Sequence, residues 1–254
     1  MRLQVERLRL LLAVVADIAA IGTAAVISVT ALSVLVAVHS GRISARPTSA
    51  RVESRTAVSP VTPVAERIAS GSKSVRPATA RVALVEFADY DCRFCAQFEK
   101  EVFPVLRREF IDVGTVAFIY RDFPLERIHP LALRASVAAE CAAAQGKYWD
   151  MHIRLFDIQA GKRSPDFVAD AKAVRLNLAT FEQCMQKERE DDIREDIRVG
   201  RSLGITGTPT FFLGKFESDG QILLSKRLSG AQSVAVFRQE IASMVREPES
   251  TRPR

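Results

Sequence analysis

The chain lacks any excess of charge over residues 81–254. Its formal net charge is +6, but residues 1–80 hold ten Lys or Arg against four Asp or Glu, so the remainder sums to zero. A nucleic-acid-binding surface needs basic residues gathered on a folded face or within a motif. Because the excess lies only in the N-terminal region, we expect no binding to nucleic acid.

Cysteine is also scarce, with one residue at each of positions 92, 95, 141 and 184. Cys92 and Cys95 form a CxxC motif, but the next two cysteines lie 46 and 89 positions beyond Cys95. That is not the spacing of a zinc ribbon, so we expect no structural metal. A CxxC pair that holds Cu(I) or zinc in a delivery module stays open as a minor alternative.

Charged side chains are absent from residues 18–38, a run of 21 positions. At a rise of about 1.5 Å per residue, such a helix spans roughly the 30 Å hydrocarbon core of a bilayer. A long signal sequence is the alternative, but signal h-regions run to only about 7 to 15 residues. We therefore expect a single transmembrane anchor after a short N-terminus, residues 1–17. The Lys and Arg counts on its two sides do not set its orientation.

Residues 39–80 lack any sustained helical or strand periodicity and are rich in Ser, Thr, Pro, Ala and Arg. Such a segment buries too little apolar surface to offset the entropy of ordering, so we expect a flexible linker. No internal repeat is evident. One globular domain is expected at 81–246, followed by a disordered tail at 247–254.

The globular part opens with an apolar run of strand length, RVALVEFADY at 81–90, which is typical of a buried central strand. The first turn of a helix is expected at Cys92, with Asp91 as its cap and a kink or break near Pro104. A thiol at a helix N-terminus faces free N–H groups and the positive end of the helix dipole. Both favour the thiolate, so Cys92 is a candidate reactive cysteine.

The rest of the domain also consists of segments that predict strands and helices. GTVAFIYRDF at 114–123 predicts a second strand, and a long helical block follows it, with a capping box expected at Thr180 and Gln183. Two strand-like runs, PTFFLGKF and QILLSKRL, flank an Asp-Gly turn and predict a hairpin. An amphipathic helix at 233–245 closes the domain.

Three separated stretches carry a resemblance to a known family: EFADYDCRFC at 86–95, RDFPL with the helical run HPLALRASVAAECAAAQGKYWDMH at 121–152, and GITGTPTFFLG at 204–214. In this order they resemble the DsbA-like branch of the thioredoxin superfamily, which are extracytoplasmic thiol:disulfide oxidoreductases. The resemblance covers about residues 80–246. It implies an α/β thioredoxin fold with an inserted helical subdomain at about 128–203.

The resemblance also assigns the site. Cys92 is the attacking cysteine, and Cys95, one helical turn away, resolves the mixed disulfide. Thr208 and Pro209 match the cis-proline loop that contacts substrate. Glu86, six residues before Cys92, is the acid that assists proton movement at Cys95; the alternative is a carboxylate at a polar edge, paired with a Lys or Arg.

Arg93 and Phe94, between the two cysteines, depart from the Pro-Phe or Pro-His of most relatives. The charge of Arg93 should lower the pKa of the Cys92 thiol modestly and make the pair more oxidising. Phe94 is expected to contribute to an apolar substrate groove. Phe98, Phe211 and Phe212 are expected to fill the core.

Cys141 and Cys184 lie on helices of the inserted block. Some DsbA-like relatives carry a second, structural disulfide there, so we expect this pair to form one in an oxidising compartment. Two buried free thiols are the alternative. His129 is expected to order the start of a helix beside Pro130, and His152 to pack near Trp149.

The resemblance implies an enzyme that forms or exchanges disulfides in secreted or periplasmic proteins, with reduced or unfolded proteins as substrates. It needs no cofactor beyond the Cys92/Cys95 disulfide. A membrane redox partner is expected to reoxidise this pair. A reductase or isomerase is the alternative, and a non-catalytic chaperone is less favoured. We expect a monomer, because no dimerisation domain is evident. The chemistry places residues 39–254 outside the cytoplasmic membrane and residues 1–17 in the cytoplasm.

Overall fold

The computed structural model describes residues 58–66, 73–157, 166–186 and 190–247. The expected N-terminus, the transmembrane anchor at 18–38 and the tail from 248 onward lie outside these ranges. Within the described ranges, no helix combines the length and the apolar character that a membrane crossing requires.

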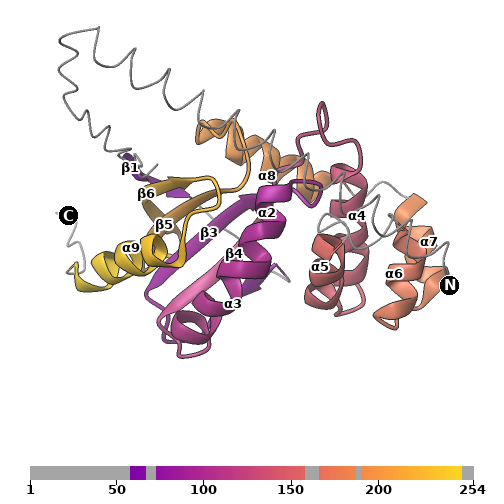
Figure 1. Ribbon diagram of the computed structural model, residues 1–254, viewed down its shortest axis with the longest axis horizontal. Coiled ribbons are helices and arrows are strands. Elements are labelled where there is room, and N and C mark those ends of the chain that lie inside the picture. Colours follow the sequence, from indigo (N-terminus) through magenta and orange to yellow (C-terminus); the bar gives the residue numbers. More distant parts are fainter. Residues whose placement is uncertain (1–57, 67–72, 158–165, 187–189, 248–254) are drawn as a thin grey trace, which may run out of the picture. The chain divides into compact units, whose positions relative to one another are not determined.

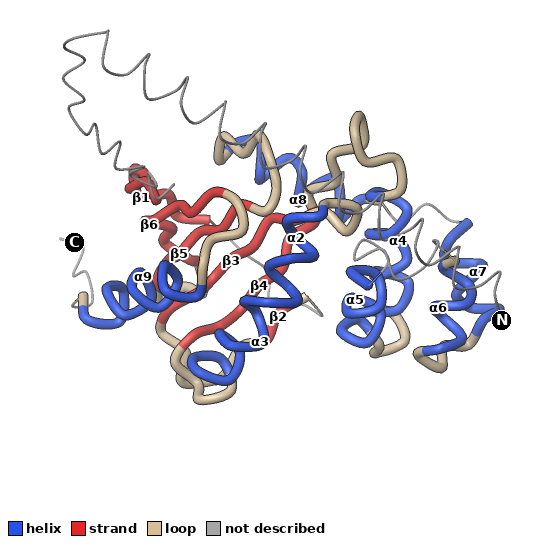
Figure 2. Tube along the Cα trace, in the orientation of Figure 1, coloured by secondary structure: helices blue, strands red, loops and turns tan. Residues whose placement is uncertain are grey.

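A six-stranded mixed sheet forms the centre of the domain (Figure 2). The strands lie in the order β1, β6, β5, β3, β4, β2. The parallel pair is β3 with β4, and the other neighbouring strands are antiparallel. Their bounds are β1 Val58–Glu66, β2 Ser74–Val75, β3 Val82–Ala88, β4 Val116–Asp122, β5 Thr210–Phe216 and β6 Ile222–Ser229. Every residue of β3 and β4 is buried, as the continuous apolar runs predict.

Two strands lie where the sequence predicts a flexible linker. β1 pairs with β6 at one edge of the sheet, with a shift of register between Pro60 and Val64, and β2 pairs with β4 at the other edge. The two prolines of β1, Pro60 and Pro63, lack the N–H group and disturb any alternating pattern. An edge strand needs hydrogen bonds on one side only and tolerates them. The prediction of an unstructured linker is therefore wrong for these stretches.

Lys73, just before β2, binds the start of the domain to its interior. Its Nζ lies 2.9 Å from Asp122, 2.8 Å from Glu140 and 2.8 Å from Asp196. These carboxylates come from β4, helix α4 (Ala132–Ala143) and helix α8 (Asp191–Ser202). A buried cation is stabilised only when anions surround it, and these three anions all belong to the folded domain. Lys73 is therefore part of the domain, which begins before residue 81.

A continuous helical run follows β3 and crosses the sheet (Figure 1). It consists of α2 (Arg93–Gln97), α3 (Phe103–Leu106) and two π-helical stretches, η1 (Phe98–Val102) and η2 (Arg107–Ile111). Pro104 lies in the first turn of α3 and does not end the run. The N-cap residue of α2 is Cys92, with no side-chain capping bond, so the predicted cap at Asp91 is wrong.

Helices cover both faces of the sheet. Phe98 of η1 packs on Phe211 of β5 and on Phe237 of α9 (Val234–Arg246), with ring centroids 4.5 and 5.4 Å apart. The other face holds Phe87 and Phe212, and α8 packs there against β4. The expected core positions of Phe98, Phe211 and Phe212 are confirmed, since each is at most 1% exposed.

The inserted subdomain is a group of four helices between β4 and α8 (Figure 1): α4, α5 (Tyr148–Asp157), α6 (Phe167–Ala173) and α7 (Leu178–Gln186). Asn177, rather than Thr180, begins α7, because its Oδ1 accepts the backbone N–H of Thr180 at 2.9 Å. Thr180 is therefore the third residue of the helix rather than its cap, so the predicted capping box is wrong.

Candidate redox site

Cys92 and Cys95 lie where β3 ends and α2 begins. The backbone N–H of Cys92 donates to the carbonyl of Asp89 at 3.1 Å, which turns the chain from strand into helix. Both cysteines are free thiols in this structure, Cys92 4% exposed and Cys95 fully buried. The arrangement matches the predicted roles of an outer attacking sulfur and an inner resolving sulfur.

The two sulfurs differ in their acidity. A hydrogen bond from the Cys95 thiol is the largest cause that lowers the pKa of Cys92 to about 6. Thr208 and the backbone N–H groups of Phe94 and Cys95 add to the shift, while partial burial opposes it. Burial raises the pKa of Cys95 well above its ordinary value. Near neutral pH the reduced site is therefore a Cys92 thiolate beside a Cys95 thiol.

The predicted proline loop faces Cys92. The peptide bond between Thr208 and Pro209 is cis, and Cys92 Sγ lies 3.5 Å from the carbonyl oxygen of Thr208. These two residues lie 116 positions apart in the sequence and meet because β5 is hydrogen-bonded to β3. The structure thus brings the CxxC motif and the proline loop together where β3 ends and β5 begins.

Arg93 and Phe94 both lie exposed at the start of α2. The Arg93 guanidinium stacks over the Phe94 ring at 4.6 Å, and Phe94 remains 46% exposed. Arg93 is not among the main groups that lower the pKa of Cys92, so its predicted electrostatic role is not carried by the structure. The stacked pair instead presents an apolar surface with a cationic rim beside the reactive sulfur.

Glu86 lies in the middle of β3, fully buried behind the cysteines. Burial raises the pKa of Glu86 well above its ordinary value, and the neighbouring charges of Glu99 and Cys92 add to the rise. Among the described residues no Lys or Arg pairs with it, so the alternative of an ion pair at a polar edge is not what the structure has. The charge of Glu86 is in turn one of the causes that raise the pKa of Cys95, so the two groups interact.

Asp89 is a functional residue that the sequence analysis missed. It is fully buried, and its carboxylate accepts three hydrogen bonds of 2.7 Å, from the backbone N–H groups of Asp91 and Leu125 and from His129 Nδ1. These contacts join the CxxC loop to the loop before α4. His129 therefore orders this loop from outside the helix, two residues before the N-cap Leu131. The signal in the sequence that could have identified Asp89 is its position, as an acidic residue between a buried strand and the CxxC motif.

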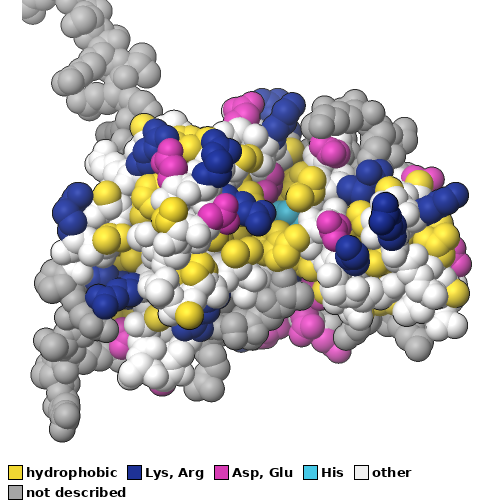
Figure 3. All heavy atoms as spheres, turned by 90° about the horizontal axis from the view of Figure 1, so that it is seen from below, with side chains coloured by type: hydrophobic (Ala, Val, Ile, Leu, Met, Phe, Trp, Pro, Cys, Tyr) yellow, Lys and Arg dark blue, Asp and Glu magenta, His cyan; other side chains and the backbone are white. Residues whose placement is uncertain are grey.

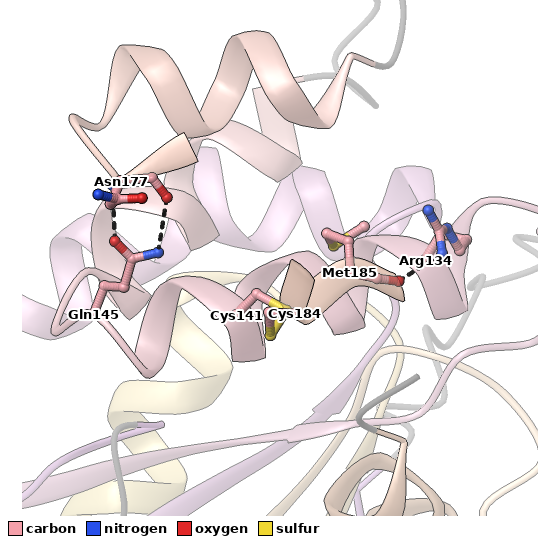
Figure 4. The surroundings of a disulfide bond; sticks show 6 residues. All are labelled: Arg134, Cys141, Gln145, Asn177, Cys184 and Met185. Carbon is pink, nitrogen blue, oxygen red and sulfur yellow. Dashed lines mark hydrogen bonds between the residues drawn. A yellow bond between two sulfur atoms is a disulfide. The ribbon is translucent and has the colours of Figure 1, made fainter. Parts of the chain in front are cut away.

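Cys141 of α4 and Cys184 of α7 form a disulfide in this structure (Figure 4). Around it, Gln145 exchanges two hydrogen bonds with the backbone of Asn177, and Arg134 donates to the Met185 carbonyl (Figure 4). These contacts join α4 and the turn after it to α7 and the turn before it. The disulfide lies within the insertion and contributes no group to the Cys92 site.

The described residues give less support to metal binding or to nucleic-acid binding. Among the described ranges no group of three or more His, Cys, Asp or Glu side chains is placed to hold a metal ion. On the face drawn in Figure 3, Lys and Arg side chains are interspersed with acidic and hydrophobic ones rather than gathered in one stripe. The redox pair is the chemistry that the described residues present.

Comparison with known proteins agrees with this geometry. A model of the thioredoxin family matches residues 77–225, which is more than half of the chain. The chain belongs to the thioredoxin family. Within the fold, the helices inserted between β4 and α8 and the CxxC pair at the start of α2 are features that the DsbA-like resemblance predicts.

Two solved structures illustrate the fold that this thioredoxin-family chain shares. α-DsbA1 from Wolbachia pipientis has a TM-score of 0.57 at 24% identity, covering 68% of this chain and 90% of that one. Oxidised BdbD from Bacillus subtilis has a TM-score of 0.60 at 20% identity, covering 74% and 100%. At such identities the likeness establishes the mixed α/β fold.

Curated relatives match the same part of the chain. Na(+)/H(+) antiporter NhaA 3 of Salinispora tropica is 36% identical over 138 residues, which is 54% of this chain and 21% of the antiporter. Disulfide bond formation protein D of Bacillus subtilis is 29% identical over 144 residues, which is 53% of this chain and 64% of that protein. The chain therefore spans about a fifth of the length of the antiporters that it matches.

Proposed function

We propose that this oxidoreductase donates its Cys92/Cys95 disulfide to reduced proteins outside the cytoplasm. The observation that carries the proposal is the lowered pKa of Cys92, about 6, next to a buried Cys95. A thiolate that is stable in the reduced enzyme favours reduction of the pair, so the disulfide is a strong oxidant.

The reaction proceeds by two thiol-disulfide exchanges. A substrate thiolate attacks Cys92 Sγ, the bond between Cys92 and Cys95 breaks, and Cys95 leaves with the electron pair. Cys95 then takes a proton, for which Glu86 is the adjacent donor. A second substrate thiolate attacks the substrate sulfur of the mixed disulfide and releases Cys92 as a thiolate. The substrate is oxidised by two electrons and the enzyme is reduced by two.

Substrate binding follows from the surroundings of Cys92. Phe94 offers an exposed ring, and the loop at Thr208 lies against the sulfur. Backbone groups next to a proline can pair with an extended peptide, which gives affinity without demanding one sequence. Unfolded or reduced proteins are the substrates that such a site accepts.

The redox potential of the Cys92/Cys95 pair tests this function. We expect a value near roughly −120 mV, measured by equilibration with glutathione and separation of the reduced and oxidised forms. A value near about −270 mV would identify a reductant instead, and would favour the reductase or isomerase alternative. In separate activity assays, Cys92→Ser should abolish both insulin reduction and oxidative refolding of a reduced substrate. The far-ultraviolet spectrum of the variant should be unchanged.

Residues 18–38 supply the membrane anchor in this proposal, with the catalytic domain on the extracytoplasmic side and residues 1–17 in the cytoplasm. The support is the run of 21 uncharged residues and the redox chemistry, which needs an oxidising compartment. A membrane redox partner then reoxidises the enzyme. Alkaline phosphatase fused after residue 254 should be active in cells, whereas activity of a cytoplasmic reporter at that position would contradict the placement.

Sodium–proton exchange is not part of the proposal, because the likeness to the antiporters is confined to 21% of their length. The protein works as a monomer, with the Cys92/Cys95 disulfide as its redox group and without a metal ion. Light scattering of the purified protein would contradict the monomer if it gave the mass of a dimer.

A further inference from the structure

A line of buried polar side chains leads from the redox pair into the inserted helices. Glu86 lies behind Cys92 and Cys95, and the charges of Glu86 and of both cysteines act on one another. Glu99, on η1, is the next carboxyl group along the line. His152 of α5 follows it, 1% exposed, so that the insertion supplies part of the surroundings of the site.

His152 and Glu99 face each other through atoms that have no other partner. His152 Nε2 lies 3.4 Å from Glu99 Oε1, and Glu99 is only 8% exposed. Within the described ranges neither atom has a hydrogen-bond partner in standard geometry. A buried polar atom without a partner is unfavourable, so the two atoms gain by approaching one another. Catalytic hydrogen bonds that are long in a resting structure often shorten during reaction.

The other ring nitrogen determines what His152 offers to Glu99. Its Nδ1 lies 2.8 Å from Tyr90 Oη, which in turn lies 3.2 Å from Tyr148 Oη. Burial raises the pKa of both tyrosines well above their ordinary values, so each keeps its proton. We assign Tyr90 as the donor to Nδ1, because Nε2 then carries the ring hydrogen and faces Glu99 Oε1.

No other carboxylate competes for this ring in the described part of the chain. The side chains packed on His152 are aromatic: Tyr90, Tyr120, Tyr148, Trp149 and Phe156. The charges of Asp122 and Glu140 reach Tyr90 and Tyr148, but both carboxylates form ion pairs with Lys73. Glu99 is the acid within ion-pair distance of His152.

We propose that His152 is a positioning residue for proton transfer to Cys95: its Nε2 hydrogen holds Glu99 as a carboxylate, and the charge of Glu99 keeps the shared proton on Glu86. The inference rests on the redox function proposed above and deepens it. Its consequence is that the inserted subdomain takes part in the chemistry of the thiols.

The step in which His152 acts is the opening of the Cys92/Cys95 disulfide. An external thiolate forms a bond to Cys92 Sγ, the bond between the two sulfurs breaks, and Cys95 leaves as a thiolate with the electron pair. The proton of Glu86 passes to Cys95, which leaves Glu86 as a carboxylate until solvent reprotonates it by way of Glu99. Without the His152 donor, Glu99 competes for the proton and Glu86 has none to give.

The test is the pH profile for reduction of the oxidised protein by dithiothreitol, with each rate divided by the thiolate fraction of the reagent. The corrected rate should fall with rising pH, with a midpoint that reports loss of the proton from Glu86. In His152→Phe we expect this midpoint to lie lower by about one pH unit, so that above both midpoints reduction is about ten-fold slower.

Matched variants separate a donor from a merely structural side chain. His152→Gln keeps an N–H toward Glu99 and an acceptor for Tyr90, so its midpoint should stay within about 0.3 pH units of the wild type. Tyr148→Phe removes a buried hydroxyl from the same cluster and should leave the midpoint unchanged. Glu99→Gln removes the charge that acts on Glu86 and should lower the midpoint as His152→Phe does, which keeps the test available if that variant does not fold.

Several outcomes would overturn the inference: a profile of His152→Phe that coincides with the wild type, a midpoint in His152→Gln as low as in His152→Phe, or no shift in Glu99→Gln. Failure of the proposed function is visible separately. In that case the wild-type protein itself would show no disulfide exchange that depends on Cys92, before any His152 variant is compared.

Discussion

His129 Nδ1 lies 2.7 Å from Asp89 Oδ2, although the two residues are 40 positions apart. Asp89 directly follows β3, the strand that leads to the redox pair, and His129 belongs to the loop that leads into the inserted subdomain. The same carboxylate oxygen accepts the backbone N–H of Leu125 at 2.7 Å. One buried carboxylate therefore joins the CxxC loop to the loop before α4.

Asp89→Asn should destabilise the domain by about 1–3 kcal/mol, because the new amide group would face N–H donors where an oxygen now accepts. Chemical denaturation of the wild type and the variant measures the difference. Asp112→Asn removes an exposed carboxylate, paired with Arg107 at 3.3 Å, and should change stability by less than about 0.5 kcal/mol. Equal effects of the two substitutions would show that Asp89 does not fix these loops.

The Cys92 thiolate makes the reduced protein sensitive to pH. Absorbance of the reduced protein at 240 nm should titrate with a midpoint of about 6, against an ordinary value of 9.0. Because the pKa is lowered on folding, the thiolate contributes stability that is fully present above about pH 9 and is lost as the pH falls through about 6. As the pH rises from about 6 to about 9, the reduced form should gain stability relative to the oxidised form, which has no Cys92 thiol to titrate.

Cys95→Ala tests the cause of that shift. The variant removes the hydrogen bond that contributes most to the lowered pKa of Cys92, so the 240 nm midpoint should rise toward the ordinary value. Cys95→Ser keeps a hydroxyl donor and should retain most of the shift. A midpoint in Cys95→Ala that stays near 6 would assign the effect to the backbone N–H groups of α2 instead.

Local patterns in the sequence predict the elements that carry the reactive groups. β3, β4 and the hairpin of β5 and β6 are apolar runs between turn residues, and the CxxC follows β3 directly. Each of these signals lies within about ten residues, so the chain can be interpreted one segment at a time. The thioredoxin core and the position of Cys92 at a helix start could be predicted for that reason.

Features that depend on distant partners could not be predicted in this way. β1 carries two prolines and becomes a strand only because β6 offers a free edge. Lys73 has no visible role until Glu140 and Asp196 surround it. The contact of His152 with Glu99 joins the insertion to the helical run after the CxxC, and no short pattern announces it.

Lys73→Met should be among the most destabilising substitutions in the domain. Burial opposes the charge of Lys73, but Asp122, Asp196 and Glu140 outweigh it and raise the pKa of the ammonium above its ordinary value. Removing this cation leaves three carboxylates together, which we expect to cost about 3–5 kcal/mol. Lys147→Met, at an exposed pair with Asp150, should cost less than about 1 kcal/mol in the same denaturation experiment.

Acid should partly reverse the effect of Lys73→Met. Without the cation, the clustered carboxylates take up protons at higher pH in the folded protein than in the unfolded chain, so the variant gains stability as the pH is lowered. The difference in unfolding free energy between the wild type and the variant should therefore shrink between about pH 7 and pH 5. A constant difference across this range would show that the ion pairs of Lys73 are not its source.

The bond between Cys141 and Cys184 should stabilise the insertion without tuning the redox site. It closes a loop with a sequence separation of 43, for which the chain-entropy model gives about 4 kcal/mol. The double variant Cys141→Ala with Cys184→Ala should lose stability of this order in denaturation, while the potential of the Cys92/Cys95 pair stays unchanged. The matched double variant Cys92→Ala with Cys95→Ala should keep its sensitivity to strong reductants, because the remaining disulfide still breaks. A shift in the potential of Cys92/Cys95 on loss of the Cys141/Cys184 bond would instead mean that α4 and α7 act on the active site.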